Sequence, residues 1–464
     1  MPPLKAAHIL AQDSIAVEAQ LALFFQQLIS PIGVAGAVIA AGVLVWAIVF
    51  RKMYETTAGI ALGSVMFQLH PDALTQNLLL GPLQAYRYAS KSIAFGLLVL
   101  AALAALAIRL DRRWRAIGFA AASFYAFQVY YTLQLLVFAN EGLARGFFGV
   151  IAITLMFTVF GIGMGRRMQD AASARSALEL LAWLAVAFIT INMVQLAAGT
   201  DGAFVGGRLA GIGGNAQMMG GISAMLLLAC VYLANDLPAK RPLRWMSLAS
   251  AGILGIFILA TGSRTATTAT VLGLASMFRL QMGRLLVFGI LGGLVAFVGI
   301  SGFEQSSSGV DRMLQAPNTR ADVWAEAVAA FMTSPIVGNL PFSGSPDTVF
   351  SGVESTFLRT LANLGLVGLA VVLMPFGAMV LAVPKALWLG KADPSYRRLT
   401  DFYVASVAAI LVLNTLDGYA FGLLTFPVIF MYITFTLGDF IQDSARELVA
   451  ATDSAEPLGE PSWT

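Results

Sequence analysis

Apolar runs of about 20 residues recur along most of this sequence, and they constrain its fold more than any other feature. A run of that length crosses the hydrocarbon core of a bilayer as an α-helix. Backbone groups in lipid must be hydrogen-bonded internally, which a helix achieves within one segment. Only 11% of the 464 residues are charged, compared with roughly a quarter in soluble domains. The sequence therefore predicts an all-α, polytopic helical membrane protein with about 12–14 transmembrane helices.

The positions of these runs divide the chain into five regions. Residues 10–29 fit either an interfacial helix or the start of a longer first span. The expected spans are 31–50, 56–70, 91–109, 116–138, 146–165, 176–198, 217–235, 243–262, 265–280, 283–300, 363–383, 401–416 and 421–438. The regions are an N-terminal segment (1–30), an N-terminal transmembrane bundle (31–300), a periplasmic loop (301–362), C-terminal transmembrane helices (363–438) and a polar tail expected to be disordered (439–464).

Basic residues cluster between the expected spans, which gives an orientation. Cytoplasmic loops of membrane proteins carry an excess of lysine and arginine. Placing all of the clusters in the cytoplasm makes the alternate loops external and leaves the C-terminus in the cytoplasm. The net charge of +3 is too small to predict binding to nucleic acid. The clusters lie at 51–52, 109–115, 166–175, 239–244, 279–284 and 391–398.

The external loop 301–362 is the only long segment outside the expected spans, and it contains one amphipathic pattern. Thr319 and Asp322 resemble a capping box at the start of a helix. Pro335 is expected to end that helix. The apolar face of this short helix comprises Trp324, Ala327, Val328 and Phe331.

Ionisable side chains gather on the predicted external side of the chain. Charges close to hydrocarbon are costly and tend to mark function. Arginines on separate loops can converge on one polyanion, because each guanidinium donates two parallel hydrogen bonds to a phosphate. Two histidines and one cysteine leave few ligands for zinc. The external ionisable residues are Arg208, Arg264, Arg320, Glu354, Arg359 and Asp417.

Each of these residues also has a simpler structural interpretation. Arg264 can extend its side chain to the membrane interface, and Arg208 can be an ordinary loop residue. Arg320 can pair with acidic residues of its own helix. Glu354 suits the N-terminus of a helix through the helix dipole, and Asp417 suits a turn. Only the joint pattern points to an anion site.

Four stretches of the chain resemble one superfamily, the O-antigen ligases and the Wzy-type polysaccharide polymerases. They are RLAGIGGNAQ (208–217), GSRTATTATVLGL (262–274), NTRADVWAEAVAAFMTSPIVG (318–338) and VESTFLRTLANLGLVGL (353–369). The last stretch is the most similar to the family pattern. The stretches occur in the family's order, within residues 200–375.

This resemblance implies a glycosyltransferase that uses an undecaprenyl-diphosphate-linked oligosaccharide at the external face of the bacterial inner membrane, without metal or other cofactor. It assigns the donor diphosphate to Arg264, Arg320 and Arg208. The ligases carry a histidine in the last motif that acts on the acceptor hydroxyl, and Glu354 takes this position here. The departure favours a polymerase, for which a flippase and a chain-length regulator are expected partners. The alternative is an O-antigen ligase that transfers the glycan to lipid A–core or another surface acceptor.

The residues themselves fit this chemistry. The leaving diphosphate gains negative charge in the transition state, and fixed cations that meet it lower the barrier. The sequence has no Asp-x-Asp motif to hold a metal, so arginines are expected to act instead. Glu354 is the candidate general base, or it orients the acceptor hydroxyl. One displacement inverts the anomeric centre. The candidates for acceptor binding or support are Arg359, Asp417 and Trp324.

A transporter of lipid-linked saccharide or another solute is the alternative from a different class. Transporters often place ionisable groups near the bilayer midplane and show internal repeats. Here the expected spans carry almost no central charge, and the polar residues gather at the external rim. This distribution favours chemistry at the external face.

Overall fold

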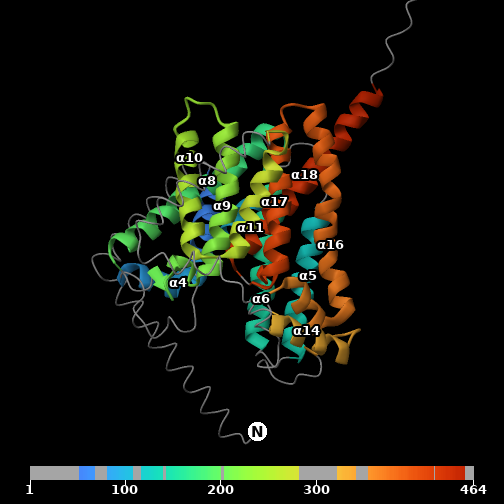
Figure 1. Ribbon diagram of the computed structural model, residues 1–464. Coiled ribbons are helices and arrows are strands. Elements are labelled where there is room, and N and C mark those ends of the chain that lie inside the picture. The colour runs from blue at the N-terminus through green and yellow to red at the C-terminus, as the bar shows by residue number, and fades with distance from the viewer. Residues whose placement is uncertain are drawn as a thin grey trace, which may run out of the picture.

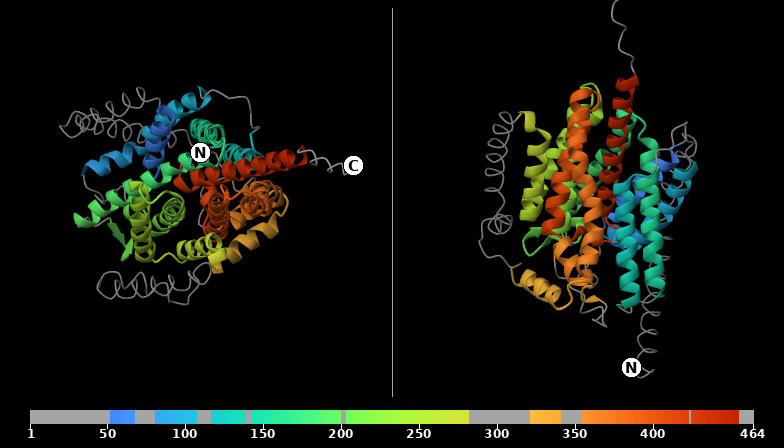
Figure 2. Two further views of the ribbon diagram at one scale, coloured as in Figure 1. Left: turned by 90° about the horizontal axis from the view of Figure 1, so that it is seen from above. Right: turned by 90° about the vertical axis from the view of Figure 1, so that its right-hand side faces the viewer.

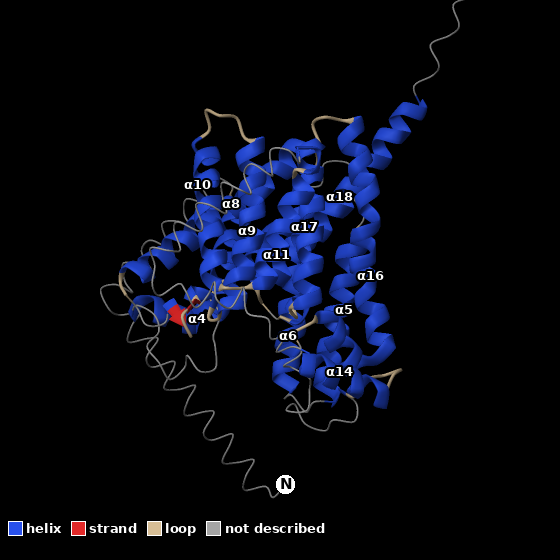
Figure 3. Cartoon of the chain, in the orientation of Figure 1, coloured by secondary structure: helices blue, strands red, loops and turns tan. Residues whose placement is uncertain are grey.

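The protein is a bundle of long α-helices packed side by side, as the computed structural model shows (Figures 1 and 3). The structure describes residues 52–67, 81–107, 117–138, 143–199, 203–281, 321–340, 354–422 and 424–454. The α-helices are α3 (Met53–Val65), α4 (Gly81–Ala107), α5 (Phe119–Phe138), α6 (Leu143–Met156), α7 (Met164–Arg167), α8 (Ala171–Ala197), α9 (Ala216–Asp236), α10 (Pro242–Thr261), α11 (Arg264–Met277), α14 (Ala321–Thr333), α16 (Thr356–Ala392), α17 (Arg397–Leu416) and α18 (Phe426–Ser454).

Shorter elements connect these helices. A π-helix, η2 (Phe157–Gly163), joins α6 to α7 in one continuous rod. Strands β1 (Phe204–Val205) and β2 (Arg208–Leu209) form a two-residue antiparallel hairpin between α8 and α9. The 3-10 turns are η4 (Gly211–Gly213), η5 (Arg279–Gln281) and η8 (Tyr419–Phe421).

Seven helices of the described residues are long and apolar enough to cross a membrane, which confirms a polytopic helical membrane protein. They are Ser90–Ala107, Gly146–Arg167, Ala171–Ala197, Ala216–Asp236, Pro242–Thr261, Thr356–Ala392 and Arg397–Leu416. Four other expected spans are also helical, in α3, α5, α11 and α18. The expected spans 31–50 and 283–300 lie outside the described residues, as does the N-terminal segment 1–30.

One expectation for the C-terminal tail was wrong. Helix α18 does not end near residue 438 but continues to Ser454, so the helical part of 439–464 is not disordered. Phe440 and Ile441 are buried, and Ala445 is buried one turn further on. This apolar stripe packs on the bundle, and it therefore keeps the chain helical beyond the span.

Helix α9 is the centre of the bundle. Of its 18-residue apolar window, 83% is buried, the largest share among the seven candidate spans. It packs against α8, α10, α11 and α17. Gly220 allows α11 to approach closely, since a Cβ there would lie 2.9 Å from the Cβ of Ala266. Small residues at helix contacts are typical of membrane bundles, where van der Waals packing holds the helices together.

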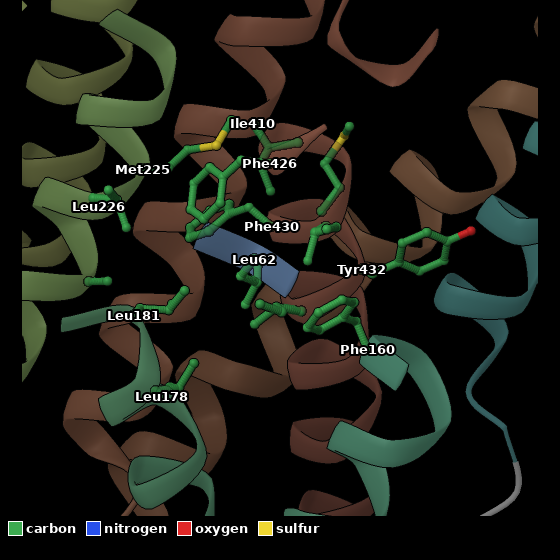
Figure 4. Close-up of a cluster of buried hydrophobic side chains, with 14 of the residues drawn as sticks. Leu62, Phe160, Leu178, Leu181, Met225, Leu226, Ile410, Phe426, Phe430 and Tyr432 are labelled. Carbon is green, nitrogen blue, oxygen red and sulfur yellow. The ribbon is translucent and has the colours of Figure 1, made fainter. Parts of the chain in front are cut away.

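The apolar core beside α9 is filled by large side chains from several helices. Figure 4 shows Phe426 and Phe430 of α18 close to Met225 and Leu226 of α9. Tyr432 is fully buried, and its hydroxyl donates a hydrogen bond to the side chain of Gln128, 2.9 Å away. Buried tyrosines in lipid-embedded bundles need such a partner. The core thus fixes α18 against α5 and α9 alike.

The two ends of the bundle differ in character. The basic end carries the loops between α9 and α10 and between α16 and α17, at the top of Figure 1. Ion pairs join helices there: Arg175 with Asp236, Arg241 with Glu179 at 2.6 Å, and Arg279 with Asp401 at 2.6 Å. The opposite end, where α9, α11 and α16 begin, is called the site end below.

Helix α16 is kinked where it meets the loop that follows α14. Gly365 has φ 62° and ψ −158°, which interrupts the helix after its first turns. The amides of Leu366 and Val367 therefore lose their helical partners and instead donate to the carbonyls of Pro335 (2.9 Å) and Ile336 (3.2 Å). This set of main-chain contacts between Pro335–Asn339 and Ala362–Val367 is called the backbone clamp below.

Glycine is needed on both sides of the clamp. A Cβ on Gly338, which has φ 73°, would lie 2.3 Å from the carbonyl of Asn363. A Cβ on Gly365 would lie 2.4 Å from the carbonyl oxygen of Ile336. Asn339 completes the clamp, because its amide donates to the carbonyl of Ala362 at 3.0 Å. The clamp fixes α14 across the site end (Figure 2).

Helix α14 confirms the expected amphipathic helix but packs through a different face. It runs from Ala321 to Thr333, two residues inside the expected limits at each end. Its contacts with α16 are made by Val323, Ala327 and Ala330, against Leu358 and Ala362. Of the expected apolar face, Ala327 is buried, whereas Val328 is exposed. The small Ala327 and Ala330 permit the close approach to α16, and the larger side chains point elsewhere.

Candidate functional site

Three helix N-termini meet at the site end. Each is capped by the side chain of the preceding residue, which accepts a backbone N–H of the first turn. Asn215 caps α9 at 2.7 Å, Ser263 caps α11 at 3.3 Å and Ser355 caps α16 at 3.4 Å. Helix N-termini carry partial positive charge and favour anions. The site end is therefore electrostatically suited to a negative group once cationic side chains join it.

Glu354 joins two segments that are far apart in the sequence. Gln217, in the first turn of α9, donates a hydrogen bond from Nε2 to Oε1 of Glu354 at 2.8 Å. The main-chain carbonyl of Gln217 accepts a second bond from the hydroxyl of Tyr419, 2.9 Å away. Gln217 and Tyr419 thus hold the carboxylate at the head of α16. Neither residue is among those predicted from the sequence.

Asp417 is buried rather than part of an exposed turn. It follows the last residue of α17, and only 5% of its surface is exposed. The hydroxyl of Thr265 donates to its Oδ1 at 3.5 Å, and Thr265 follows Arg264 on α11. Asn414, one turn earlier on α17, accepts a bond from Thr356 at 2.9 Å. The end of α17 therefore connects the starts of α11 and α16.

The structure brings Arg208 and Arg264 to the same turn. Nε of Arg208, on strand β2, donates to the carbonyl of Thr261 at 2.6 Å. Thr261 is the last residue of α10, so this cation caps a helix C-terminus. Arg264 opens α11 three residues later, and its side chain is exposed. Arg320, the third predicted diphosphate ligand, lies outside the described residues.

Arg359 is engaged by aromatic side chains. Its guanidinium carbon lies 4.6 Å from the ring centroid of Phe421, and Nη2 donates to the hydroxyl of Tyr131 at 3.2 Å. A cation over an aromatic face is attracted by the ring quadrupole. Arg359 thus ties α16 to α5 and to η8, which makes it a supporting residue of the site end.

Trp324 lies on α14, the helix that the backbone clamp holds against α16. Its side chain is half-buried. The indole Nε1 is buried and makes no hydrogen bond within the described part of the chain. The supporting role of Trp324 stays a prediction.

Most of the predicted site residues in the described ranges therefore share one end of the bundle. Three separate hydrogen bonds hold them there: Gln217 to Glu354, Arg208 to the carbonyl of Thr261, and Thr265, which follows Arg264, to Asp417. Within the described ranges, His, Cys, Asp and Glu side chains form no group of three that could hold a metal ion. The arrangement offers one oriented carboxylate beside cationic side chains and capped helix N-termini.

Comparison with known proteins adds no assignment. No protein-family model matches the sequence, and no curated protein matches it significantly. The fold defines the class as a multi-pass, all-helical membrane protein, and the site end must be interpreted from its own residues.

Proposed function

We propose that this protein is a Wzy-type glycosyltransferase that polymerises oligosaccharide repeats carried on undecaprenyl diphosphate. The observation that supports the proposal most is the hydrogen bond between Gln217 and Glu354. It joins the first family-like stretch (208–217) to the last (353–369) at the end where Arg208 and Arg264 meet. Residues of three separated motifs are thus adjacent, as one active site would require.

In this proposal the cationic side chains receive the donor diphosphate. Arg264 and Arg208, with Arg320, offset the charge that develops on the leaving group, aided by the N-terminus of α11. The acceptor hydroxyl forms the new C–O bond at the anomeric carbon. The bond to the diphosphate oxygen breaks, and its electron pair stays with the diphosphate. The acceptor proton passes to Glu354.

Gln217 and Tyr419 have a positioning role in this scheme. Gln217 fixes one carboxylate oxygen of Glu354, and Tyr419 fixes the carbonyl of Gln217. With Oε1 held by Gln217, the other oxygen can accept the proton of an acceptor hydroxyl that attacks in a single displacement, from the side opposite the leaving group. The proposal therefore includes inversion at the anomeric carbon. Product NMR that showed retention would contradict it.

Orientation and location belong to the same proposal. The basic end holds Arg175, Arg241, Arg279 and Arg398, and the positive-inside rule assigns it to the cytoplasm. The site end then faces the periplasm of a bacterial inner membrane, where the proposed polymerisation would take place. The C-terminal helix α18 ends on the cytoplasmic side.

Polymerase is favoured over O-antigen ligase by the identity of residue 354. The ligases place a histidine at the matching position, whereas this chain places a glutamate. The two activities share the donor and differ in the acceptor, which is another lipid-linked repeat for a polymerase and a lipid A–core or surface acceptor for a ligase.

Deleting the protein from its own cell and sizing the undecaprenyl-linked glycans tests the proposal. Single lipid-linked repeats that accumulate, with long chains lost, support a polymerase. Long lipid-linked chains that fail to reach a final acceptor support the ligase instead. An unchanged glycan profile refutes both and favours transport of another solute. Complementation with Glu354→Gln should fail, whereas Glu326→Gln, which alters an exposed carboxylate on α14, should restore the polymer.

A further inference from the structure

Helix α14 presents three distinct faces. Successive residues of an α-helix are about 100° apart, so residues three and four apart share a side. Its polar side carries Asp322, Glu326 and Thr333. The neighbouring side carries Val323, Ala327 and Ala330, which pack on α16. The third side, opposite the acidic residues, carries Phe331, Trp324, Val328 and Met332.

This third face is apolar and partly uncovered. Val328 is 45% exposed and Met332 is 70% exposed. The apolar surface continues past the end of the helix to Ile336, which is 66% exposed. Large apolar side chains that cluster on one side of a short helix usually have a partner in the cell. The acidic side chains on the opposite face point to a partner that covers one side only.

The uncovered face is continuous with the lipid-facing surface of α16. Ile336 accepts a hydrogen bond from the amide of Val367, so the two residues are adjacent. Leu366 and Val367, both about half exposed, begin the apolar stripe of α16 beyond its kink. Figure 2 shows α14 lying across the axis of the bundle instead of along it. In a bilayer spanned by the bundle, a helix in this position would run along the membrane surface.

We propose that α14 is an interfacial helix whose Val328, Met332 and Ile336 insert into the lipid leaflet next to the site end. An amphipathic helix at the interface buries its apolar side at the boundary between head groups and acyl chains. Asp322 and Glu326 then face water. Because that polar side is acidic, insertion depends on apolar contact and not on anionic head groups. The inference is independent of the proposed chemistry.

Site-directed fluorescence in nanodiscs tests this placement on the full chain. Cys230, the only cysteine, is replaced by alanine, and an environment-sensitive dye is attached at Met332→Cys. Two further positions calibrate the signal. Glu326→Cys reports the polar side of the same helix, and Leu381→Cys reports the middle of the membrane span of α16, where the side chain is 75% exposed. Lipids carry a nitroxide quencher either near the head group or deep in the acyl chain.

The expected result is loss of fluorescence at position 332 with the shallow quencher, and less loss with the deep one. Position 381 should show the reverse order, and position 326 should respond to aqueous iodide but to neither lipid. The result at 332 should not change when anionic lipid is removed. Quenching at 332 by iodide and not by lipid would overturn the proposal, because the face would then be in water. Protection from both quenchers would also overturn it, because protein would then cover the face.

Discussion

Replacing Gly365 by alanine should undo the backbone clamp and destabilise the site end. The added Cβ would lie 2.4 Å from the carbonyl oxygen of Ile336 and 2.6 Å from the amide nitrogen of Gly338. Neither neighbour can rotate away, because both are main-chain atoms. The torsion angles of Gly365, φ 62° and ψ −158°, also lie in a region that is essentially restricted to glycine.

The size of the effect follows from these contacts. Backbone strain at such a position costs about 1–3 kcal/mol. Loss of the hydrogen bonds from the amides of Leu366 and Val367 costs about 0.5–1.5 kcal/mol each. The total is about 2–6 kcal/mol, which lowers the melting temperature of a 464-residue chain by roughly 2–6 °C, at about 2.1 cal/mol/K of unfolding entropy per residue.

The single cysteine provides the assay. Cys230 is buried in α9, so a thiol-reactive dye becomes fluorescent only as the bundle opens on heating. Gly377→Ala is the matched control, because Gly377 lies on the same helix and a Cβ there meets nothing within 4 Å. That control should melt like the wild type or slightly higher, since alanine is the better helix former. Hydrogen exchange should be faster at Asn339, Leu366 and Val367 in Gly365→Ala alone. A Gly365→Ala variant with unchanged melting and unchanged exchange would refute the reasoning.

Three further predictions concern the site and the basic end. Glu354→Gln should lower polymer formation at least about 100-fold at an unchanged melting temperature. Gln217→Ala should lower polymer formation less. Equal activity of Glu354→Gln and the wild type would contradict the assignment of Glu354 as the general base. Arg208→Lys should destabilise by about 1 kcal/mol, because lysine cannot reproduce the Nε bond to the end of α10. Thiol-dye melting measures the loss, and an unchanged melting temperature would contradict the capping role. Burial raises the pKa of Asp439 from 3.8 to about 7. This carboxylate accepts N–H groups at the start of α5 and lies near Asp443 and Arg446. Folding therefore favours the protonated form, and the free energy of unfolding should fall by about 4 kcal/mol as the pH rises from 4 through 7. Asp439→Asn should flatten this pH profile of stability. Parallel profiles for the variant and the wild type would contradict the role of Asp439.

The membrane spans were predictable because each is a local property of the sequence. An apolar run of sufficient length forms a helix in lipid whatever its neighbours are. The kink in α16 was not predictable in this way. Gly365 lies within a strongly apolar run and is compatible with a continuous helix, and its left-handed conformation depends on Pro335 and Ile336, about thirty residues earlier.

The sequence allowed the charged residues of the candidate site to be predicted, but not the residues that hydrogen-bond to them. Arginine and glutamate near hydrocarbon predict a functional site, because burying their charges is costly. Gln217 does not, since a glutamine at a helix start has many uncharged roles, and its bond to Glu354 exists only in the folded bundle. Asp417 was expected to suit a turn, yet packing against α11 buries it. In α14, Val323 and two alanines make the helix contact in place of the larger Trp324 and Phe331, because tight packing selects small side chains.

The backbone clamp also has a consequence for engineering. Most of its bonds run between main-chain amides and carbonyls, and the side chain of Asn339 adds bonds to the carbonyls of Ala330 and Ala362. The segment that follows α14 is therefore attached mainly through main-chain atoms, while α14 itself also packs on α16 through Val323, Ala327 and Ala330. A foreign helix grafted in place of 321–333 should keep this attachment, provided that Gly338, Asn339 and Gly365 are retained and that the residues at 323, 327 and 330, which pack on α16, are kept. The outer surface of this end of the molecule can thus be exchanged while the main-chain contacts that hold it stay the same.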